Sequence, residues 1–195
     1  TKQEVTAELQ KSGILPTIDH VNLFLTWGEV EGIVCSGIDK GKKTTYALLD
    51  ERVPPTRELC REEALARLAS RYFQSHSPAQ LQDFVWWSGL TATECRLAIN
   101  LIKTELMTET FDSREYFIHQ SWKGKNESEP VLRLLPAFDE YLISYKNRTD
   151  VLPLEHHSKA FNRFGTFYPV ILYNGKIIGN WGRSVKKNSI QIEMD

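Results

Sequence analysis

The chain has 195 residues, of which 41% are hydrophobic and 25% are charged, as is ordinary for a soluble globular protein. This length allows one large domain or two to three small ones with a sizeable core. No apolar run approaches the length that spans a bilayer, and the start at Thr1 lacks both the basic and the apolar region of a signal peptide. These features argue against a membrane protein and predict a cytoplasmic location.

The formal net charge is −1, but the charges are unevenly distributed. Residues 119–195 carry 11 basic and 8 acidic groups, whereas acidic groups exceed basic ones over 1–55 and 56–118. Binding to DNA requires local positive potential rather than a high overall charge. The composition therefore permits DNA binding without arguing for it.

The cysteines are three in number and none stands in a CxxC pair, so neither a disulfide framework nor a zinc site is predicted. Free thiols fit a reducing cytoplasm. The chain has no initiator Met, opens directly in helix-like sequence and stops on a strand. From these features we expect a piece of a longer chain.

The first 55 residues predict two helices followed by a hairpin. A Thr1-x-x-Glu4 capping box opens the first helix, and a rough apolar stripe marks the second. That stripe consists of Ile18, Val21, Leu25 and Val30. The expected elements are helices over 1–12 and 17–28, and strands over 33–35 and 44–49 around a turn rich in Gly and Lys.

Residues 56–122 repeat this order after a break at Pro54-Pro55. The third helix of this stretch opens at a Thr91-x-x-Glu94 capping box. Its expected inward side chains are Cys95, Ala98, Leu101, Ile102 and Leu106. The expected elements are a helix over 57–76, a helix that begins at Pro78 and ends near Gly89, the helix after Thr91, and strands over 108–111 and 116–118.

The order helix, helix, hairpin thus occurs twice, with Tyr46 and Tyr116 at matching places in the second strands. This is the plan of a winged helix, in which the second helix enters a DNA groove and the hairpin touches the backbone. The alternative is a pair of generic α+β pieces.

The C-terminal third predicts a small β-rich unit after a solvated linker over 123–130. Asn174-Gly175 suits a type I′ turn between strands over 169–173 and 176–181, and an alternating strand follows over 189–193. We therefore predict an α+β chain of three units. They are a winged helix over 1–55, a winged helix over 56–122 and a β-rich unit over 130–195.

Five blocks of sequence resemble, in order and spacing, one bacterial family. They are Arg71-Tyr72-Phe73, Pro78-Ala79, Asp83-Phe84 with Trp87-Ser88-Gly89-Leu90, the run from Leu134 to Tyr141, and Gly175 with Gly179-Asn180-Trp181. Together they resemble the winged-helix DNA-binding family that includes DNA glycosylases acting on alkylated purines and interstrand crosslinks. The resemblance covers about residues 57–182, and more loosely 1–55.

The resemblance implies tandem winged helices that grip duplex DNA and, in the enzymes, cleave the N-glycosidic bond of a damaged base. The family's catalytic motif, Gln-x-Gln or Gln-x-Asp, lies N-terminal to everything matched here. No catalytic residue is therefore carried over, and this stretch alone is expected to be inactive. Gln80-Leu81-Gln82 has the same form but lies directly before Asp83, within the matched stretch and not upstream of it. We interpret it as solvent-facing glutamines around a buried leucine.

Basic residues near hairpin turns are the best candidates for phosphate contacts. Lys40, Lys42 and Lys43 cluster at the first turn, where their ammonium groups reach outward. Arg183, Lys186 and Lys187 follow the third hairpin. For both sets the alternative is a tip that only improves solubility.

Arg96, Asn100 and Lys103 follow at near-helical spacing on the polar face of the second unit's presumed recognition helix. Arg and Asn side chains are suited to base edges, although an exposed polar face is the commoner explanation. The corresponding helix of the first unit offers Asp19 and Glu29, a poor surface for phosphate.

Other polar and aromatic residues are assigned structural roles. Of Trp86 and Trp87, one is expected in the core and the other at a seam between units. Asp139 is expected to cap the turn after Pro136, with an acid/base role for Asp83 or Asp139-Glu140 as the alternative. The pair His156-His157 cannot face one ion from regular structure, so no metal is predicted, and no cofactor motif is present.

Three functions remain open. The leading one is binding of double-stranded DNA within a glycosylase-like repair protein. The others are a DNA-binding regulator without chemistry and a module that binds proteins. The lesion and the oligomeric state are left open by the sequence.

Overall fold

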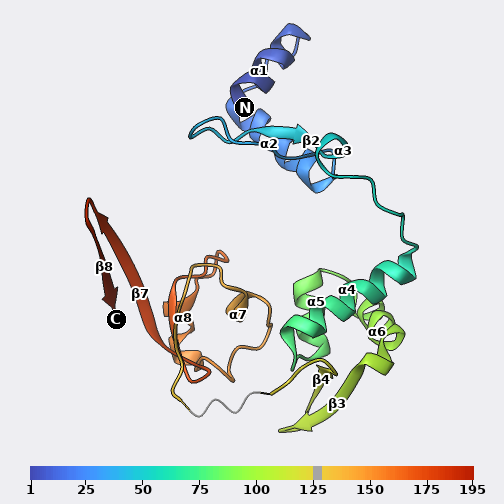
Figure 1. Cartoon of the computed structure of the whole chain (residues 1–195), viewed down its shortest axis with the longest axis vertical. Coiled ribbons are helices and arrows are strands. Elements are labelled where there is room, and N and C mark those ends of the chain that lie inside the picture. Colours follow the sequence, from blue (N-terminus) through green and yellow to red (C-terminus); the bar gives the residue numbers. More distant parts are fainter. Residues whose placement is uncertain (125–128) are drawn as a thin grey trace. The chain divides into compact units, whose positions relative to one another are not determined.

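The computed structural model describes residues 1–124 and 129–195, which form two compact units, Thr1–Glu58 and Leu59–Asp195 (Figure 1). Part of the linker predicted over 123–130 lies outside the described residues. Within the described ranges, no helix has the length and apolar character needed to cross a bilayer.

The first unit consists of two helices, a short hairpin and one further helical turn. Thr1 and Thr17 cap the two helices, because each hydroxyl accepts a hydrogen bond from the backbone N–H three residues on. The predicted helices and hairpin are present, and the final helical turn was not predicted. The elements are α1 (Lys2–Lys11), α2 (Ile18–Val30), the antiparallel strands β1 (Val34–Ser36) and β2 (Tyr46–Leu48), and α3 (Leu49–Arg52).

The apolar stripe predicted on α2 is buried only at its centre. Val21 is fully buried and Leu25 is 7% exposed, whereas Ile18 and Val30 are 61% and 78% exposed. The partners of α2 in this unit are the 10-residue helix α1 and three-residue strands, which cover one side of the helix. The rest of the stripe faces outward.

The first part of the second unit is a three-helix core with a hairpin. Phe73 is fully buried, with its ring centroid 5.5 Å from that of Phe84 and 5.7 Å from that of Phe117. Cys95, Ala98 and Ile102 are buried as predicted, while Leu101 is 38% exposed. The elements are α4 (Arg61–His76), α5 (Leu81–Ser88), α6 (Ala92–Leu101), the 3-10 helix η1 (Lys103–Glu105), and the antiparallel strands β3 (Leu106–Phe111) and β4 (Arg114–His119).

The expectation that Pro78 opens a helix is wrong, because α5 begins at Leu81. Ala79 instead exchanges two backbone hydrogen bonds with Phe117, at 3.1 and 2.8 Å, so this segment is extended beside β4. Gln80 then caps α5, its backbone N–H donating to Asp83 Oδ2 at 2.9 Å. Pairing with a strand distant in sequence overrides the local preference of proline.

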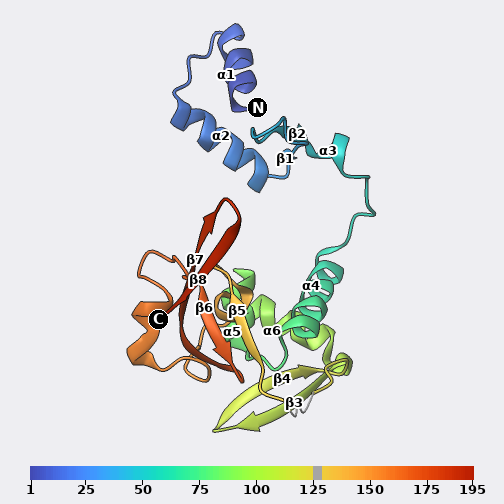
Figure 2. The same ribbon diagram turned by 60° about the vertical axis from the view of Figure 1, so that its left-hand side comes forward.

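The second part of the unit is built on one antiparallel sheet in the order β5-β6-β7-β8 (Figure 2). Asn174 and Gly175 have φ of 47° and 79°, as a type I′ turn requires, which confirms the predicted hairpin. The elements are β5 (Leu132–Leu135), α7 (Glu140–Ile143), η2 (Leu154–His156), α8 (His157–Ala160), β6 (Val170–Tyr173), β7 (Lys176–Lys186) and β8 (Ser189–Met194).

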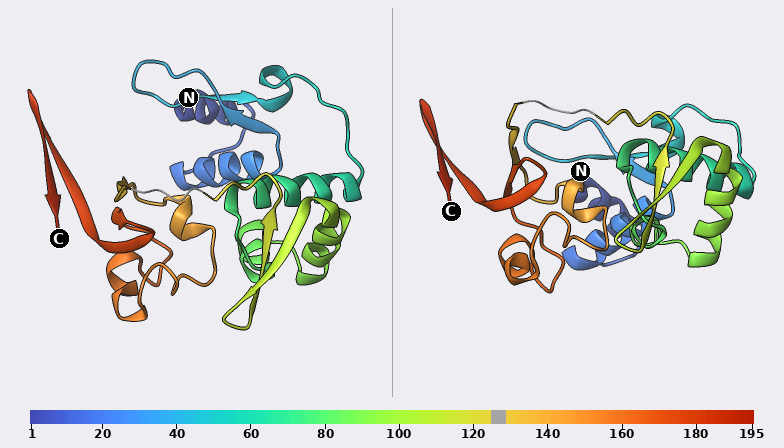
Figure 3. Two further views of the ribbon diagram at one scale, coloured as in Figure 1. Left: turned by 60° about the horizontal axis from the view of Figure 1, so that its bottom comes forward. Right: turned by 90° about the horizontal axis from the view of Figure 1, so that it is seen from below.

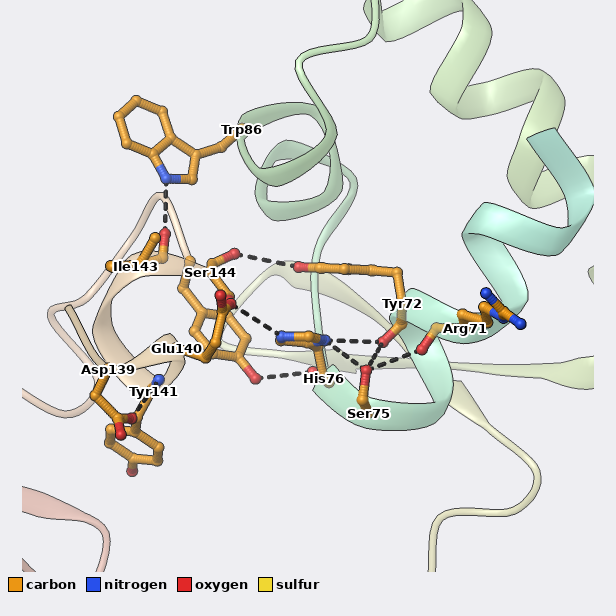
Figure 4. Close-up of polar contacts among 11 residues, drawn as sticks. Arg71, Tyr72, Ser75, His76, Trp86, Asp139, Glu140, Tyr141, Ile143 and Ser144 are labelled. Carbon is orange, nitrogen blue, oxygen red and sulfur yellow. Dashed lines mark hydrogen bonds and ion pairs between the residues drawn. The ribbon is translucent and has the colours of Figure 1, made fainter. Parts of the chain in front are cut away.

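Residues 139–151 dock against α4, α5 and β4, and we call this contact the seam. Tyr72 OH donates to the Ser144 carbonyl at 3.3 Å, and Tyr145 OH donates to the His76 carbonyl at 3.0 Å (Figure 4). His76 Nε2 also lies 3.6 Å from Glu140 Oε2. The C-terminal end of α4 is thereby tied to α7.

The two adjacent tryptophans divide their roles as predicted. Trp87 packs against the helical core, whereas Trp86 is 51% exposed and donates its Nε1–H to the Ile143 carbonyl at 2.8 Å (Figure 4). Because consecutive helix positions point about 100° apart, one indole faces the core and the other faces the seam.

Asp83 anchors the seam from α5. It is only 3% exposed, and its two carboxylate oxygens accept backbone N–H groups from Gln80 and from Lys146, each at 2.9 Å. Both oxygens therefore serve local structure, which favours an anchoring role over acid/base chemistry. Asp139 accepts the Tyr141 N–H at 2.9 Å, which confirms its predicted capping role.

The carboxylate of Asp150 forms a bidentate ion pair with Arg114 of β4. Arg114 Nη1 and Nη2 donate to its two oxygens at 3.0 and 2.9 Å, and Tyr116 OH donates at 3.1 Å. Lys176, at the start of β7, donates to the Asp150 carbonyl at 2.6 Å. This clamp links β4 to the sheet that carries the C-terminal hairpin.

Several residues of the five blocks noted in the sequence take part in this architecture. Tyr72 and Asp83 hold the seam, Tyr141 OH donates to the Gly175 carbonyl at 2.9 Å, and Trp181 Nε1 donates to the Leu135 carbonyl at 2.7 Å. These residues of the blocks therefore hold the parts of the second unit together.

Replacement of Phe73 by Ala is expected to destabilise the second unit by about 3–5 kcal/mol, because it leaves a cavity among three aromatic rings. Urea unfolding followed by tryptophan fluorescence measures the change. The control is Phe111→Ala on β3, where the ring is 66% exposed and the expected change is within about 0.5 kcal/mol. Equal losses in the two variants would contradict this packing.

Replacement of Asp150 by Asn is expected to destabilise the chain by about 1 kcal/mol at pH 7. Hydrogen bonds from Arg114 hold the pKa of Asp150 below its ordinary value. The clamp therefore contributes fully above the unfolded pKa of about 3.9, and its contribution is lost as the pH falls through the lower folded pKa. The difference in unfolding free energy between wild type and variant should shrink from pH 7 to pH 3. A difference independent of pH would refute the clamp, and Glu155→Gln is the control.

Candidate nucleic-acid interface

Helix α6 and the 3-10 helix η1 bring together three residues that the sequence predicts to bind DNA. Cys95, Ala98 and Ile102 turn inward, so the opposite side of the helix faces solvent. Arg96, Asn100 and Lys103 together line one shallow cavity of about 300 Å³. We call it the α6 groove. Its remaining lining residues are Leu81, Ile99, Glu115 and Phe117.

The α6 groove combines a guanidinium, an amide and an ammonium group at helical spacing. Arg and Asn form paired hydrogen bonds with guanine and adenine edges, and Lys is suited to phosphate oxygens. Lys103 stands in η1 and not in α6 itself, because the helix ends at Leu101. Glu115 of β4 contributes a carboxylate to the same lining and lowers its positive potential.

Two of the three lysines of the first hairpin contact side chains of α1 in the same unit. Lys40 Nζ lies 3.0 Å from Glu4 Oε1, and Lys43 Nζ donates to Gln3 Oε1 at 3.0 Å. Lys42 is exposed at the turn between them. The sequence does not indicate these pairings, because the partners on α1 lie far away along the chain.

The hairpin of β7 and β8 has two different faces. Its register pairs Arg183 with Ile192, Val185 with Ile190 and Lys186 with Ser189. Residues opposite each other share a face and successive residues alternate. One face therefore carries Trp181, Arg183, Val185, Ile190, Ile192 and Met194, while the other carries small and polar side chains.

The apolar face of this hairpin is uncovered. Val185, Ile190 and Ile192 are 71%, 63% and 50% exposed, and Lys186 and Lys187 stand at the turn. Figure 3 shows the distal part of β7 with β8 extending past the rest of the sheet. Only the basic residues of this hairpin are predicted as DNA contacts, although the alternation of apolar and polar residues over 189–193 already indicates an apolar face.

The candidate residues of the second unit form two sites. Figure 1 shows α6 and the β7–β8 hairpin at opposite ends of residues 59–195. Arg96, Asn100 and Lys103 lie at the first, and Arg183, Lys186 and Lys187 at the second.

The sequence brings to mind two kinds of site, a metal site and a pair of glutamines. Within the described ranges, no three His, Cys, Asp or Glu side chains gather as ligands. His157 Nε2 lies 3.3 Å from the Leu152 carbonyl, in keeping with a structural role. Gln80 is the N-cap of α5 and Gln82 is exposed on its first turn, so they do not converge as a catalytic pair.

The sequence of the chain is similar to that of a DNA-repair glycosylase. It is 26% identical over 170 residues to a Streptomyces sahachiroi protein named interstrand DNA cross-link repair glycosylase, covering 80% of this chain and 46% of the relative. The chain thus spans about half the length of that curated relative.

The solved structure of Streptomyces sahachiroi DNA glycosylase AlkZ shares the fold. The TM-score is 0.69 at 21% sequence identity, covering 98% of this chain and 60% of that one. The observed mixed α/β architecture is therefore that of a known structure. The model of the family described as DNA glycosylase AlkZ-like matches residues 1–195. The chain belongs to the AlkZ-like DNA glycosylase family.

Proposed function

We propose that this chain binds double-stranded DNA as part of a DNA-repair glycosylase. The observation that carries the proposal is the α6 groove, where Arg96 and Asn100 of α6 and Lys103 of η1 line one exposed cavity. Membership of the AlkZ-like family supports the choice of ligand. In the whole protein the activity is excision of alkylated or crosslinked purine bases from DNA. The described residues supply binding to the duplex.

The proposal includes a winged-helix arrangement in both helix–helix–hairpin segments, over 1–55 and 56–122, followed by a β-rich unit over 130–195. In this proposal α6 is the recognition helix and the β3–β4 hairpin is the wing, and the order α5, α6, β3, β4 supports that assignment. The acidic groups Glu109, Asp112 and Glu115 lie on that wing, and its Arg114 is held by Asp150. Contact with DNA is therefore assigned to α6 and not to the wing.

The β7–β8 hairpin supplies a second contact in this proposal. A ribbon with an exposed apolar face and a basic turn suits the minor groove, where proteins insert apolar side chains and place Arg or Lys beside phosphates. Val185 and Ile190 occupy the apolar face, and Lys186 and Lys187 the turn.

A protein-binding role is the second candidate, and α2 favours it. Leu23, Phe24 and Trp27 are 65%, 46% and 64% exposed beside Ile18 and Val30. Clusters of exposed apolar side chains of this kind mark interaction surfaces. Salt separates the two functions, since phosphate contacts impose a steep decline of affinity with salt and apolar contacts do not.

Replacement of Lys103 by Ala is expected to weaken duplex binding uniformly and to reduce the slope of log K against log salt by about 0.9, the value for one phosphate contact. Asn100→Ala should cost about 1–3 kcal/mol on preferred sequences and less on others. Fluorescence anisotropy with labelled duplexes at several salt concentrations measures both. The control is Arg67→Ala, an exposed position on α4. Equal effects of control and test variants would refute the groove assignment.

Simultaneous replacement of Lys40, Lys42 and Lys43 by Ala is expected to weaken duplex binding, because the exposed ammonium group of Lys42 and the two that α1 holds at the same turn are lost. Since Lys40 is paired with Glu4, Glu4→Gln should strengthen binding by releasing its ammonium. The same anisotropy titration tests both variants. Unchanged affinity in the triple variant would show that the hairpin tip serves solubility alone.

A further inference from the structure

Strand β8 has a free edge. In the order β5-β6-β7-β8 it pairs with β7, and no residue that the structure describes pairs with its other side (Figure 3). Sheets protect such edges with proline, a bulge or several charges. The six residues of β8 include no proline, their register with β7 is regular, and Glu193 is the one charged residue among them. The edge is therefore open to a further strand.

The register shows which backbone groups face this edge. Asn180 and Asp195 exchange two backbone hydrogen bonds, at 2.8 and 3.0 Å. In an antiparallel ladder, residue pairs that bond each other alternate with pairs whose N–H and C=O groups point outward. The regular register from Asn180 onward therefore turns the backbone groups of Ile190, Ile192 and Met194 away from β7. These residues present donors and acceptors at every second position.

The same three residues carry the apolar side chains of β8. Ile190, Ile192 and Met194 are 63%, 50% and 68% exposed. A strand added at this edge would bond their backbone groups and pack against the flanks of their side chains. The edge thus fits an extended strand with apolar residues at alternate positions, and β8 is itself such a strand.

A second copy of β8 also matches the charges. Antiparallel pairing of two identical strands has a two-fold axis, and an axis through Gln191 brings outward-facing residues together. Ile190 then lies opposite Ile192 of the second copy. On the other face, Lys187 lies opposite Asp195 of the second copy, and symmetry forms this ion pair twice.

The other axes that bring outward-facing residues together fit less well. An axis through Ile190 would set Met194 opposite Lys186, which already belongs to β7. An axis through Ile192 would set Asp195 opposite a serine instead of a lysine. Backbone pattern and charge therefore select the same register.

We propose that two copies of this chain associate through antiparallel pairing of their β8 strands about Gln191. The contact closes at two copies, because both contribute the same edge. It uses the edge of β8, whereas the proposed DNA contact uses the face of the hairpin. The inference therefore does not rest on the proposed function.

Analytical ultracentrifugation of the complete 195-residue chain without DNA tests the association. We expect a dimer that forms as the concentration rises to about 1 mM. Ile192→Pro removes an outward N–H and no bond to β7, and should weaken the dimer at least about tenfold. The matched control is Arg183→Pro, directly opposite on β7, which removes an N–H at the other edge and should leave the dimer unchanged. A monomer throughout, or equal losses in the two variants, would overturn the proposal.

Disulfide formation tests the register and decides the matter if Ile192→Pro fails to fold. In a Cys60→Ser background, Gln191→Cys should oxidise to a covalent dimer, because the two Cα atoms at the axis lie roughly 4.5 Å apart, within disulfide reach. Ser184→Cys, opposite Gln191 on β7, is the control and should stay monomeric after oxidation. No cross-link at Gln191→Cys, or the same yield in both variants, would contradict the pairing.

Exchange of charges tests the ion pairs. Lys187→Asp should weaken the dimer about tenfold, because like charges then face each other at both ends of the paired strands. Adding Asp195→Lys to the same chain should restore it. A double variant as weak as the single one would refute the assigned register.

Discussion

The second unit depends on the docking of residues 139–151 onto the helical core. Every strong contact in this seam joins residues that are distant in sequence, as in Tyr72 with Ser144 and Arg114 with Asp150. Asp83 is buried yet fully occupied by two backbone N–H groups, so removing the docked segment would leave a carboxylate oxygen unpaired. This constraint fixes the sheet that carries the β7–β8 hairpin to the body that carries α6. Both proposed DNA contacts therefore belong to one compact unit.

Several residues of the sequence blocks that carry the resemblance have structural roles. Tyr72, Asp83, Asp139, Tyr141 and Trp181 are each tied to a backbone group by a polar side-chain atom. Substitution at such positions leaves a polar group without its partner, whereas exposed residues that contact a ligand tolerate replacement by others of similar charge. These residues of the resemblance thus have structural roles and lie apart from the residues proposed to bind DNA.

Local sequence patterns predicted most helices and strands correctly. Features that depend on contacts between distant segments were not predicted. The Thr91 capping box, the Asn174-Gly175 turn, the Asp139 cap and the two faces of Trp86-Trp87 follow from residues within a few positions of one another. The start of α5 was wrong because Ala79 pairs with Phe117, on a strand that no local pattern connects to it. The closeness of Arg96, Asn100 and Lys103 follows from their spacing in the sequence, and their role in binding DNA stays a prediction. The pairing of Lys40 with Glu4 and the clamp on Asp150 arise only when distant segments meet.

The central claim is that the second unit holds duplex DNA through α6 and the β7–β8 hairpin. Amide hydrogen exchange of the complete chain, measured with and without a saturating duplex, tests it most directly. The account predicts slower exchange over residues 96–103 and 183–189 in the presence of DNA, with both effects reversed by high salt. Slower exchange confined to α2, or no change in either segment, would contradict it.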